Sequence, residues 1–217
     1  FRQALSYAVD RQKLSDAFWG GKAVVPHGHQ YPEFGDMYFA DYPVEEYNVE
    51  KAKQLLAESS YKGQPVTYEL RNGYYTFGNE VAEAIVDMWK GIGVNCKVVY
   101  KEKEDKSTLI RNWSNSMRFT DPAGGLWLLW GSLPDWKWAN KPQGFLDAGA
   151  ILTGATNVAE RKTAARKMMD IFRDEVPAIL LYYPVENWGV RDGLHWHPYS
   201  SQTLNFRADS FWATSGK

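Results

Sequence analysis

The chain has 217 residues, with 25 Lys and Arg against 26 Asp and Glu, which leaves a formal net charge of −1. A near-neutral chain has no long-range attraction for nucleic acid or an anionic membrane. No apolar run approaches the ~20 residues that a membrane-spanning helix needs. The single cysteine, Cys96, excludes an internal disulfide and a multi-cysteine metal cluster.

Aromatic residues are unusually frequent, with 10 Trp, 13 Tyr and 10 Phe. Several stand beside Gly, Pro or Asn, in sequence that is typical of loops rather than of periodic core elements. Two interpretations remain open: a Trp-rich core and interface, or a site that stacks flat ligands or sugars.

The first elements are predicted to be helices. Phe1, Ala4, Leu5 and Ala8 follow helical spacing, and Asp10 is predicted to cap a second helix that ends at Gly20-Gly21. Residues 22–47 hold several Pro and Gly and show no periodicity, which predicts an irregular segment. Asn48 is predicted to cap the next short helix.

A strand–helix–strand unit follows. Residues 66–71 and 94–100 alternate apolar and polar side chains, and residues 78–92 place Val81, Ile85 and Trp89 on one helical face. Short joints between these segments predict a βαβ unit with parallel strands. Cys96 lies on the apolar side of its strand and is predicted to be a buried, inert thiol.

The remaining elements are less regular. We predict a helix over 105–116, a short buried strand over "LWLLW" (126–130) and a central strand over "AILLYY" (178–183). Asn157 is predicted to cap a helix that stops before Pro177, and the tail from Trp188 shows strand-like pieces without a clear partner. This order predicts an α/β or α+β domain with a mostly parallel sheet.

No catalytic signature is present. The sequence has no G-x-S-x-G elbow, H-E-x-x-H motif, Walker loop or EF-hand loop, and no cofactor is expected. The histidines form two pairs, His27 with His29 and His195 with His197. They would make a metal site only if the pairs met, and otherwise they are surface or loop residues.

Two residues are placed where ligands bind in open α/β sheets, outside the carboxyl ends of strands. Arg71 ends the first strand of the βαβ unit, and Trp130 ends the predicted strand 126–130. A guanidinium there offers two parallel hydrogen bonds to a carboxylate or phosphate, and an indole offers a stacking face. A surface ion pair is the alternative for Arg71.

Four segments together resemble family 5 of the solute-binding proteins of ABC importers, the peptide- and nickel-binding group. They cover nearly the whole chain, in the family's order. These segments are "FRQALSYAVDRQKL", "YNVEKAKQLLAES", "VAEAIVDMWKGIGVNCKVV" and "TNVAERKTAARKMMDIFRDEVPAILLYYP".

The resemblance implies a lobe of the periplasmic-binding-protein type II kind, of class α/β, with a βαβ unit and a mixed sheet. Residues 1–202 would form the second, C-terminal lobe of a longer polypeptide, and residues 203–217 a tail that returns to the first lobe. The lobes would close on a ligand and present it to an ABC permease in the membrane, without a catalytic step. We therefore expect a monomer that binds a small molecule or peptide but no nucleic acid. It would lie in the periplasm, or outside the cell and membrane-associated in a Gram-positive host.

The resemblance also implies a ligand site. In dipeptide-binding members an Arg at the end of this strand holds the ligand's carboxylate, and Arg71 matches it within about one residue. Peptide-binding members hold the ligand's α-amine with an Asp three residues after the Trp that ends the later strand. Here that position is Leu133, and Asp135 follows two residues later. The candidate ligand-binding residues are Arg71, Tyr74, Arg118, Trp127, Trp130, Leu133, Asp135 and Trp136.

The ligand class stays open at this point. Leu133 counts against a ligand that is held by a free α-amine. The Trp and Tyr residues in "GLWLLWGSLPDWKW" and "RNGYYTF" suit an oligosaccharide, an opine-like conjugate or a blocked peptide at least as well as a free peptide. An enzyme with an unrecognised site and a purely structural interaction domain are the alternatives to a binding protein.

Overall fold

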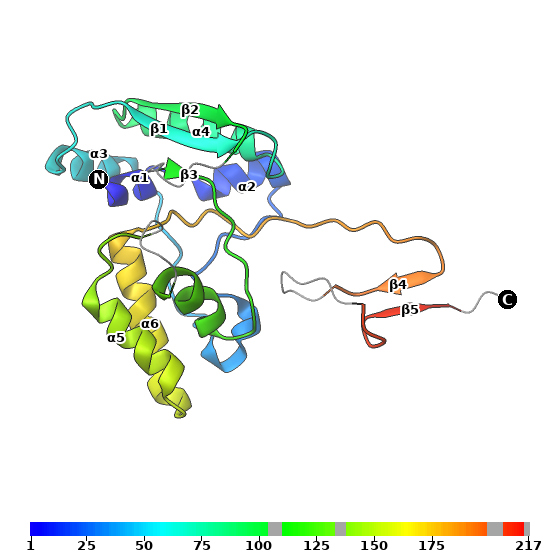
Figure 1. Ribbon diagram of the computed structural model, residues 1–217. Coiled ribbons are helices and arrows are strands. Elements are labelled where there is room, and N and C mark those ends of the chain that lie inside the picture. The colour runs from blue at the N-terminus through cyan, green and yellow to red at the C-terminus, as the bar shows by residue number, and fades with distance from the viewer. Residues whose placement is uncertain (104–109, 133–137, 199–205, 215–217) are drawn as a thin grey trace.

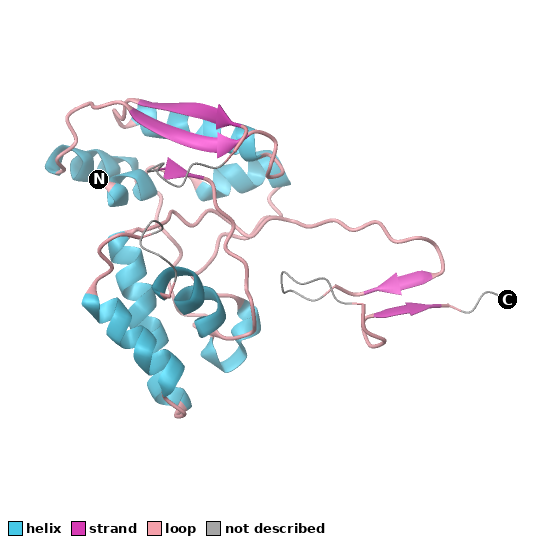
Figure 2. Cartoon of the chain, viewed as in Figure 1, coloured by secondary structure: helices cyan, strands magenta, loops and turns pink. Residues whose placement is uncertain are grey.

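The computed structural model describes residues 1–103, 110–132, 138–198 and 206–214 (Figures 1 and 2). Figure 1 shows a sheet and its helices as one layer, a helical layer beneath it, and an arm that carries a hairpin away from both.

The sheet has three parallel strands in the order β2-β1-β3. They are β1 (Val66–Arg71), β2 (Cys96–Lys101) and β3 (Ile110–Arg111). Helix α4 (Gly78–Gly91) joins β1 to β2, which confirms the predicted βαβ unit. Tyr68, Leu70 and Cys96 are buried, as the apolar side of an alternating strand should be.

Three further helices complete the first core, the buried apolar cluster around the sheet. They are α1 (Arg2–Tyr7), α2 (Arg11–Trp19) and α3 (Val49–Glu58). Trp89 of α4 is 2% exposed, and its indole Nε1 donates a hydrogen bond to the Leu5 carbonyl at 3.0 Å. The predicted caps are confirmed, because Asp10 and Asn48 accept hydrogen bonds from backbone amides at the starts of α2 and α3.

The second core is the buried cluster of the helical layer. Its helices are the 3₁₀ segment η1 (Pro32–Met37), the π-helical segment η2 (Ala123–Gly131), α5 (Gln143–Gly154) and α6 (Val158–Glu175). Asn157 accepts from the Glu160 amide at 3.1 Å, which confirms the predicted cap of α6. Within the described residues, no helix combines the length and apolarity that a membrane crossing requires.

Three predicted elements need correction. "LWLLW" is not a strand, since all five residues lie in η2. The described part of the segment 105–116 is not helical: Ile110–Arg111 forms β3, and residues 112–116 have no regular structure. Helix α5 and segment η1 were not predicted.

The segment "AILLYY" is not a central strand. The structure places it as an extended seam between the two cores. Ala178 and Leu180 pack against the second core, whereas Ile179, Leu181 and Tyr182 pack against the first. Among the described residues its strand pairing is limited to an isolated antiparallel bridge between Tyr183 and Val24.

Beyond the seam, an extended arm leads to a two-stranded antiparallel hairpin that stands apart from both layers (Figure 1). Its strands are β4 (Leu194–Trp196) and β5 (Phe211–Ala213). Phe206 is 62% exposed and Trp212 is 48% exposed, although aromatic rings of the hairpin stack on one another. The hairpin therefore carries apolar surface that neither core covers.

Candidate ligand-binding site

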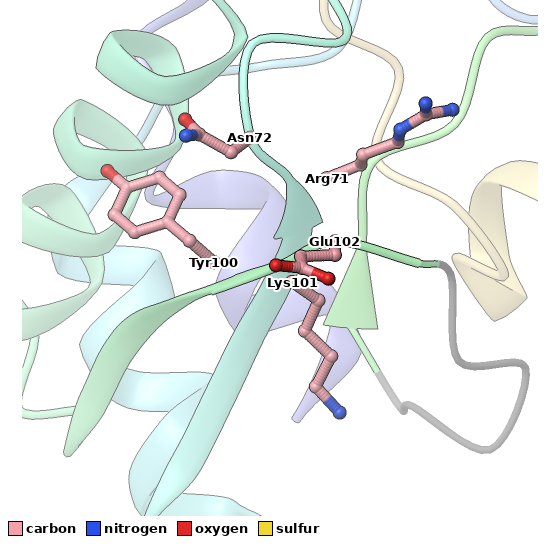
Figure 3. Close-up of a pocket in the computed structure, with 5 residues that line it drawn as sticks. All are labelled: Arg71, Asn72, Tyr100, Lys101 and Glu102. Carbon is pink, nitrogen blue, oxygen red and sulfur yellow. The ribbon is translucent and has the colours of Figure 1, made fainter.

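A hollow of about 450 Å³ lies at the carboxyl edge of the sheet, where β1 and β2 end. Five residues line it, as Figure 3 shows: Arg71, Asn72, Tyr100, Lys101 and Glu102. Arg71 extends from β1 away from Asn72 and Tyr100, toward the segment that follows β3. The hollow contains Arg71, the residue that the sequence predicted to bind a carboxylate.

Of the two basic residues that line the hollow, Lys101 has an acidic partner among the described residues and Arg71 does not. Lys101 forms an ion pair with Glu69 at 2.8 Å. Arg71 is exposed and makes no ion pair with any residue in the described ranges, and its guanidinium lies 5.0 Å from the Tyr74 ring centroid. The surface ion pair considered for Arg71 is therefore absent from the described part of the chain, where no residue accepts a hydrogen bond from its five donors.

The loop from β1 to α4 is held at several points. Asn79 of α4 accepts a hydrogen bond from the Gly73 amide at 3.2 Å and donates one to the Asn72 side chain at 2.6 Å. Phe77 has a φ of 56°, a conformation that costs a bulky residue energy, and its ring packs edge-on against Trp19 at 5.2 Å. These contacts fix the backbone from which Tyr74, 54% exposed, projects.

Trp113 is a candidate site residue that the sequence analysis did not identify. It follows β3 at the same edge of the sheet as Arg71, and it is 42% exposed. The wrong helix prediction over 105–116 hid this position, because only the parallel pairing of β3 with β1 brings Trp113 to the carboxyl edge.

Trp130 lies elsewhere. It is 5% exposed in the second core, and its Nε1 donates to His29 Nε2 at 2.9 Å and to the Asn115 side chain at 3.2 Å. Its ring packs edge-on against Phe172 of α6 at 5.0 Å. Since Trp130 does not end a strand, the argument that placed it at a sheet edge is wrong, and its predicted contact with a ligand stays untested.

Trp127 is half-buried and packs against α5. A Cβ built on Gly149 would lie 2.0 Å from the Trp127 ring, so this close approach requires the glycine. Arg118 is exposed and forms no hydrogen bond or ion pair with another described residue. Leu133, Asp135 and Trp136, also predicted as ligand-binding residues, lie outside the described residues.

The histidines have local roles. His27 Nδ1 lies 2.6 Å from the Tyr42 carbonyl, and the His195 ring stacks on Trp212 with centroids 5.3 Å apart. The described ranges contain no group of three or more His, Cys, Asp or Glu side chains that could hold a metal ion.

Comparison with known proteins identifies the family. Residues 1–137, well over half of the chain, match the model of the middle part of bacterial extracellular solute-binding proteins, family 5. A curated relative, the oligopeptide-binding protein AppA of Bacillus subtilis, is 23% identical over 254 residues. That match covers 97% of this chain but only 43% of AppA, so the chain spans less than half of this relative's length.

Solved structures share the fold. AppA of Bacillus subtilis, crystallised with a nonapeptide, superposes with a TM-score of 0.69 at 18% identity, over 99% of this chain and 47% of AppA. DppA of Helicobacter pylori, in complex with the peptide STSA, superposes with a TM-score of 0.71 at 21% identity, over 84% of this chain and 38% of DppA. These matches confirm the α/β fold of a type II periplasmic binding protein, and the chain belongs to family 5 of the bacterial extracellular solute-binding proteins.

Proposed function

We propose that this chain is part of the extracytoplasmic substrate-binding component of an ABC importer. It binds a peptide-like or other polar small solute and delivers it to a membrane permease, with no chemical step. Family membership supports this role, as does the similarity to the oligopeptide-binding protein AppA. The protein would work in the periplasm, or at the outer cell surface of a Gram-positive host.

One observation carries the proposal: Arg71 stands at the carboxyl edge of a parallel sheet, beside a hollow, without a carboxylate partner in the described part of the chain. A guanidinium in this position offers charge-assisted hydrogen bonds to a carboxylate, which are stronger than those between neutral groups. We therefore assign Arg71 to the ligand's carboxylate, with the exposed Tyr74 ring beside it.

Native mass spectrometry of the protein purified from its source tests this function. We expect a co-purified solute whose mass and fragmentation identify a peptide or a blocked peptide. An oligosaccharide or an opine-like conjugate would keep the transport role and change the ligand class. A protein that carries no solute, and binds none from panels of these three classes, would contradict the proposed function.

The second part of the proposal concerns the tail. Residues 1–202 form one lobe. Residues 203–217, which include β5, return to a part of the protein outside these 217 residues and help, with β4, to cover it. An isolated two-stranded hairpin is at best marginally stable in water. Burying one of its exposed aromatic side chains would contribute roughly 1.5–3 kcal/mol.

Hydrogen exchange tests the proposed role of the tail. In the 217-residue chain, shown to be monomeric, the amides of β4 and β5 should exchange much faster than those of β1, α4 and β2. In the native protein the same hairpin amides should become protected. Equal protection of the hairpin and the βαβ unit in the monomeric chain would contradict this proposal.

A further inference from the structure

The residues that directly follow β1 and β3, which we call the exits of these strands, form one cluster at the edge of the sheet. The two strands run parallel, and Glu69 is paired with Arg111, so the residues that follow both strands emerge at the same edge. Tyr75 joins the two exits: its hydroxyl donates to Ser114 Oγ at 3.3 Å and accepts from the Ser114 amide at 3.0 Å. The loop after β1 and the segment after β3 are therefore held against each other.

Each exit carries an arginine with an aromatic ring beneath it. The Arg71 guanidinium lies 5.0 Å from the Tyr74 ring centroid, and that of Arg111 lies 5.1 Å from the Trp113 ring. Both distances are within the range of cation–π attraction, which orients the guanidinium over the ring. Trp113 stays 42% exposed beside Arg111, and it follows β3 at the edge of the sheet where Arg71 ends β1.

We propose that Trp113 is a specificity-determining residue, which stacks on a planar group that the ligand carries next to its carboxylate. Tyr75 is its positioning residue, because its two hydrogen bonds to Ser114 fix the backbone adjacent to Trp113. The preferred ligands are peptides or N-acyl conjugates whose carboxyl-terminal residue bears an aromatic ring, since one Cα then presents carboxylate and ring together. This inference rests on the proposed function.

Calorimetry of the native protein with two probes tests the inference. The probes are N-acetyl-Ala-Phe and N-acetyl-Ala-Ala as free acids. Wild type should bind the Phe probe roughly two- to tenfold more tightly, the range expected for an aromatic pair. Trp113→Ala should remove this preference while leaving the affinity for the Ala probe nearly unchanged. Trp113→Leu, which keeps apolar bulk, should lose most of the preference as well.

A matched control separates stacking from a general effect of losing a tryptophan. Trp188 is 45% exposed, lies on the arm and contacts Trp196, far along the chain from the site. Trp188→Ala should keep the wild-type preference for the Phe probe. The inference is overturned if wild type shows no preference, or if Trp113→Ala and Trp188→Ala retain the same preference.

Tyr75→Phe tests the positioning role, because it removes the hydroxyl and keeps the ring. Its preference for the Phe probe should fall, whereas its preference for the Ala probe over the corresponding C-terminal amide, which reports on Arg71, should persist. A merely structural role would lower both preferences together and would contradict the assignment of Tyr75. If wild type binds the acids through Arg71 but without regard to the ring, this inference fails and the proposed function stands.

Discussion

Replacing Arg11 by alanine is expected to lower the free energy of unfolding by about 3–5 kcal/mol, because several buried acceptors lose their hydrogen bonds to a charged group. Arg11 is 3% exposed. Its guanidinium donates to the Leu180 carbonyl of the seam at 2.6 Å, to the Val9 carbonyl at 3.1 Å and to the Ser6 hydroxyl at 2.8 Å. These bonds tie the start of α2 to the seam that lies between the two cores, and alanine would leave the acceptors buried and unpaired.

Burial also shifts the pKa values of Arg11 and of the nearby Glu45. Burial lowers the pKa of Arg11 to about 10, and the nearby charge of Glu45 partly offsets this effect. Burial likewise raises the pKa of Glu45, and the positive charge of Arg11 acts in the opposite direction. Arg11→Ala should therefore raise the pKa of Glu45 further, which nuclear magnetic resonance of the carboxyl group would measure.

Urea unfolding followed by circular dichroism measures the stability effect. Arg166→Ala is the matched control, since Arg166 forms an exposed ion pair with Asp41 at 3.0 Å on the surface of α6. Exposed pairs of this kind contribute about 0–1 kcal/mol. If Arg11→Ala costs no more than Arg166→Ala, the guanidinium is not the link between α2 and the seam that we describe.

Local pattern was enough to predict the βαβ unit. Apolar side chains recur every second residue along β1 and β2 and at helical spacing along α4. These local patterns agree with the turn residues that separate the three elements. The caps at Asp10, Asn48 and Asn157 were predictable for a similar reason, because a side-chain oxygen bonds an amide three residues away.

Short apolar runs were not predictable in this way. "LWLLW" is apolar throughout, so its periodicity cannot distinguish a buried strand from a buried helix. Within η2, Leu126, Leu129 and Trp130 all enter the second core. The seam is a different case: its side chains alternate because they face two cores, so the same pattern that marks a strand arises without a sheet ladder.

The candidate site was predictable only in part. Arg71 followed from the end of a clearly patterned strand. Trp113 depends on the pairing of β3, a strand of two residues with too few positions to show alternation. The tryptophan in "RNWSNS" carries no local sign that it lies at the same sheet edge as Arg71, since only the pairing of β3 with β1 brings the ends of the two strands to one edge.

Replacing Arg71 by alanine is expected to weaken the binding of a ligand with a free carboxylate by about 1.5–3 kcal/mol, the contribution of a hydrogen bond to a charged group. This corresponds to roughly ten- to a hundredfold in affinity. The fold should tolerate the change, because Arg71 is exposed and makes no ion pair with another described residue. An unaltered melting temperature would establish that the loss belongs to binding.

A thermodynamic cycle on the native protein tests the central claim, that this edge of the sheet binds a ligand through Arg71. Wild type and Arg71→Ala are titrated in a calorimeter with N-acetyl-Ala-Phe and its C-terminal amide, and with the unblocked dipeptide and its amide. We predict that wild type prefers each acid to its amide by roughly ten- to a hundredfold, and that Arg71→Ala binds acid and amide about equally. The same preference for the acids in both proteins would contradict the assignment of the carboxylate to Arg71.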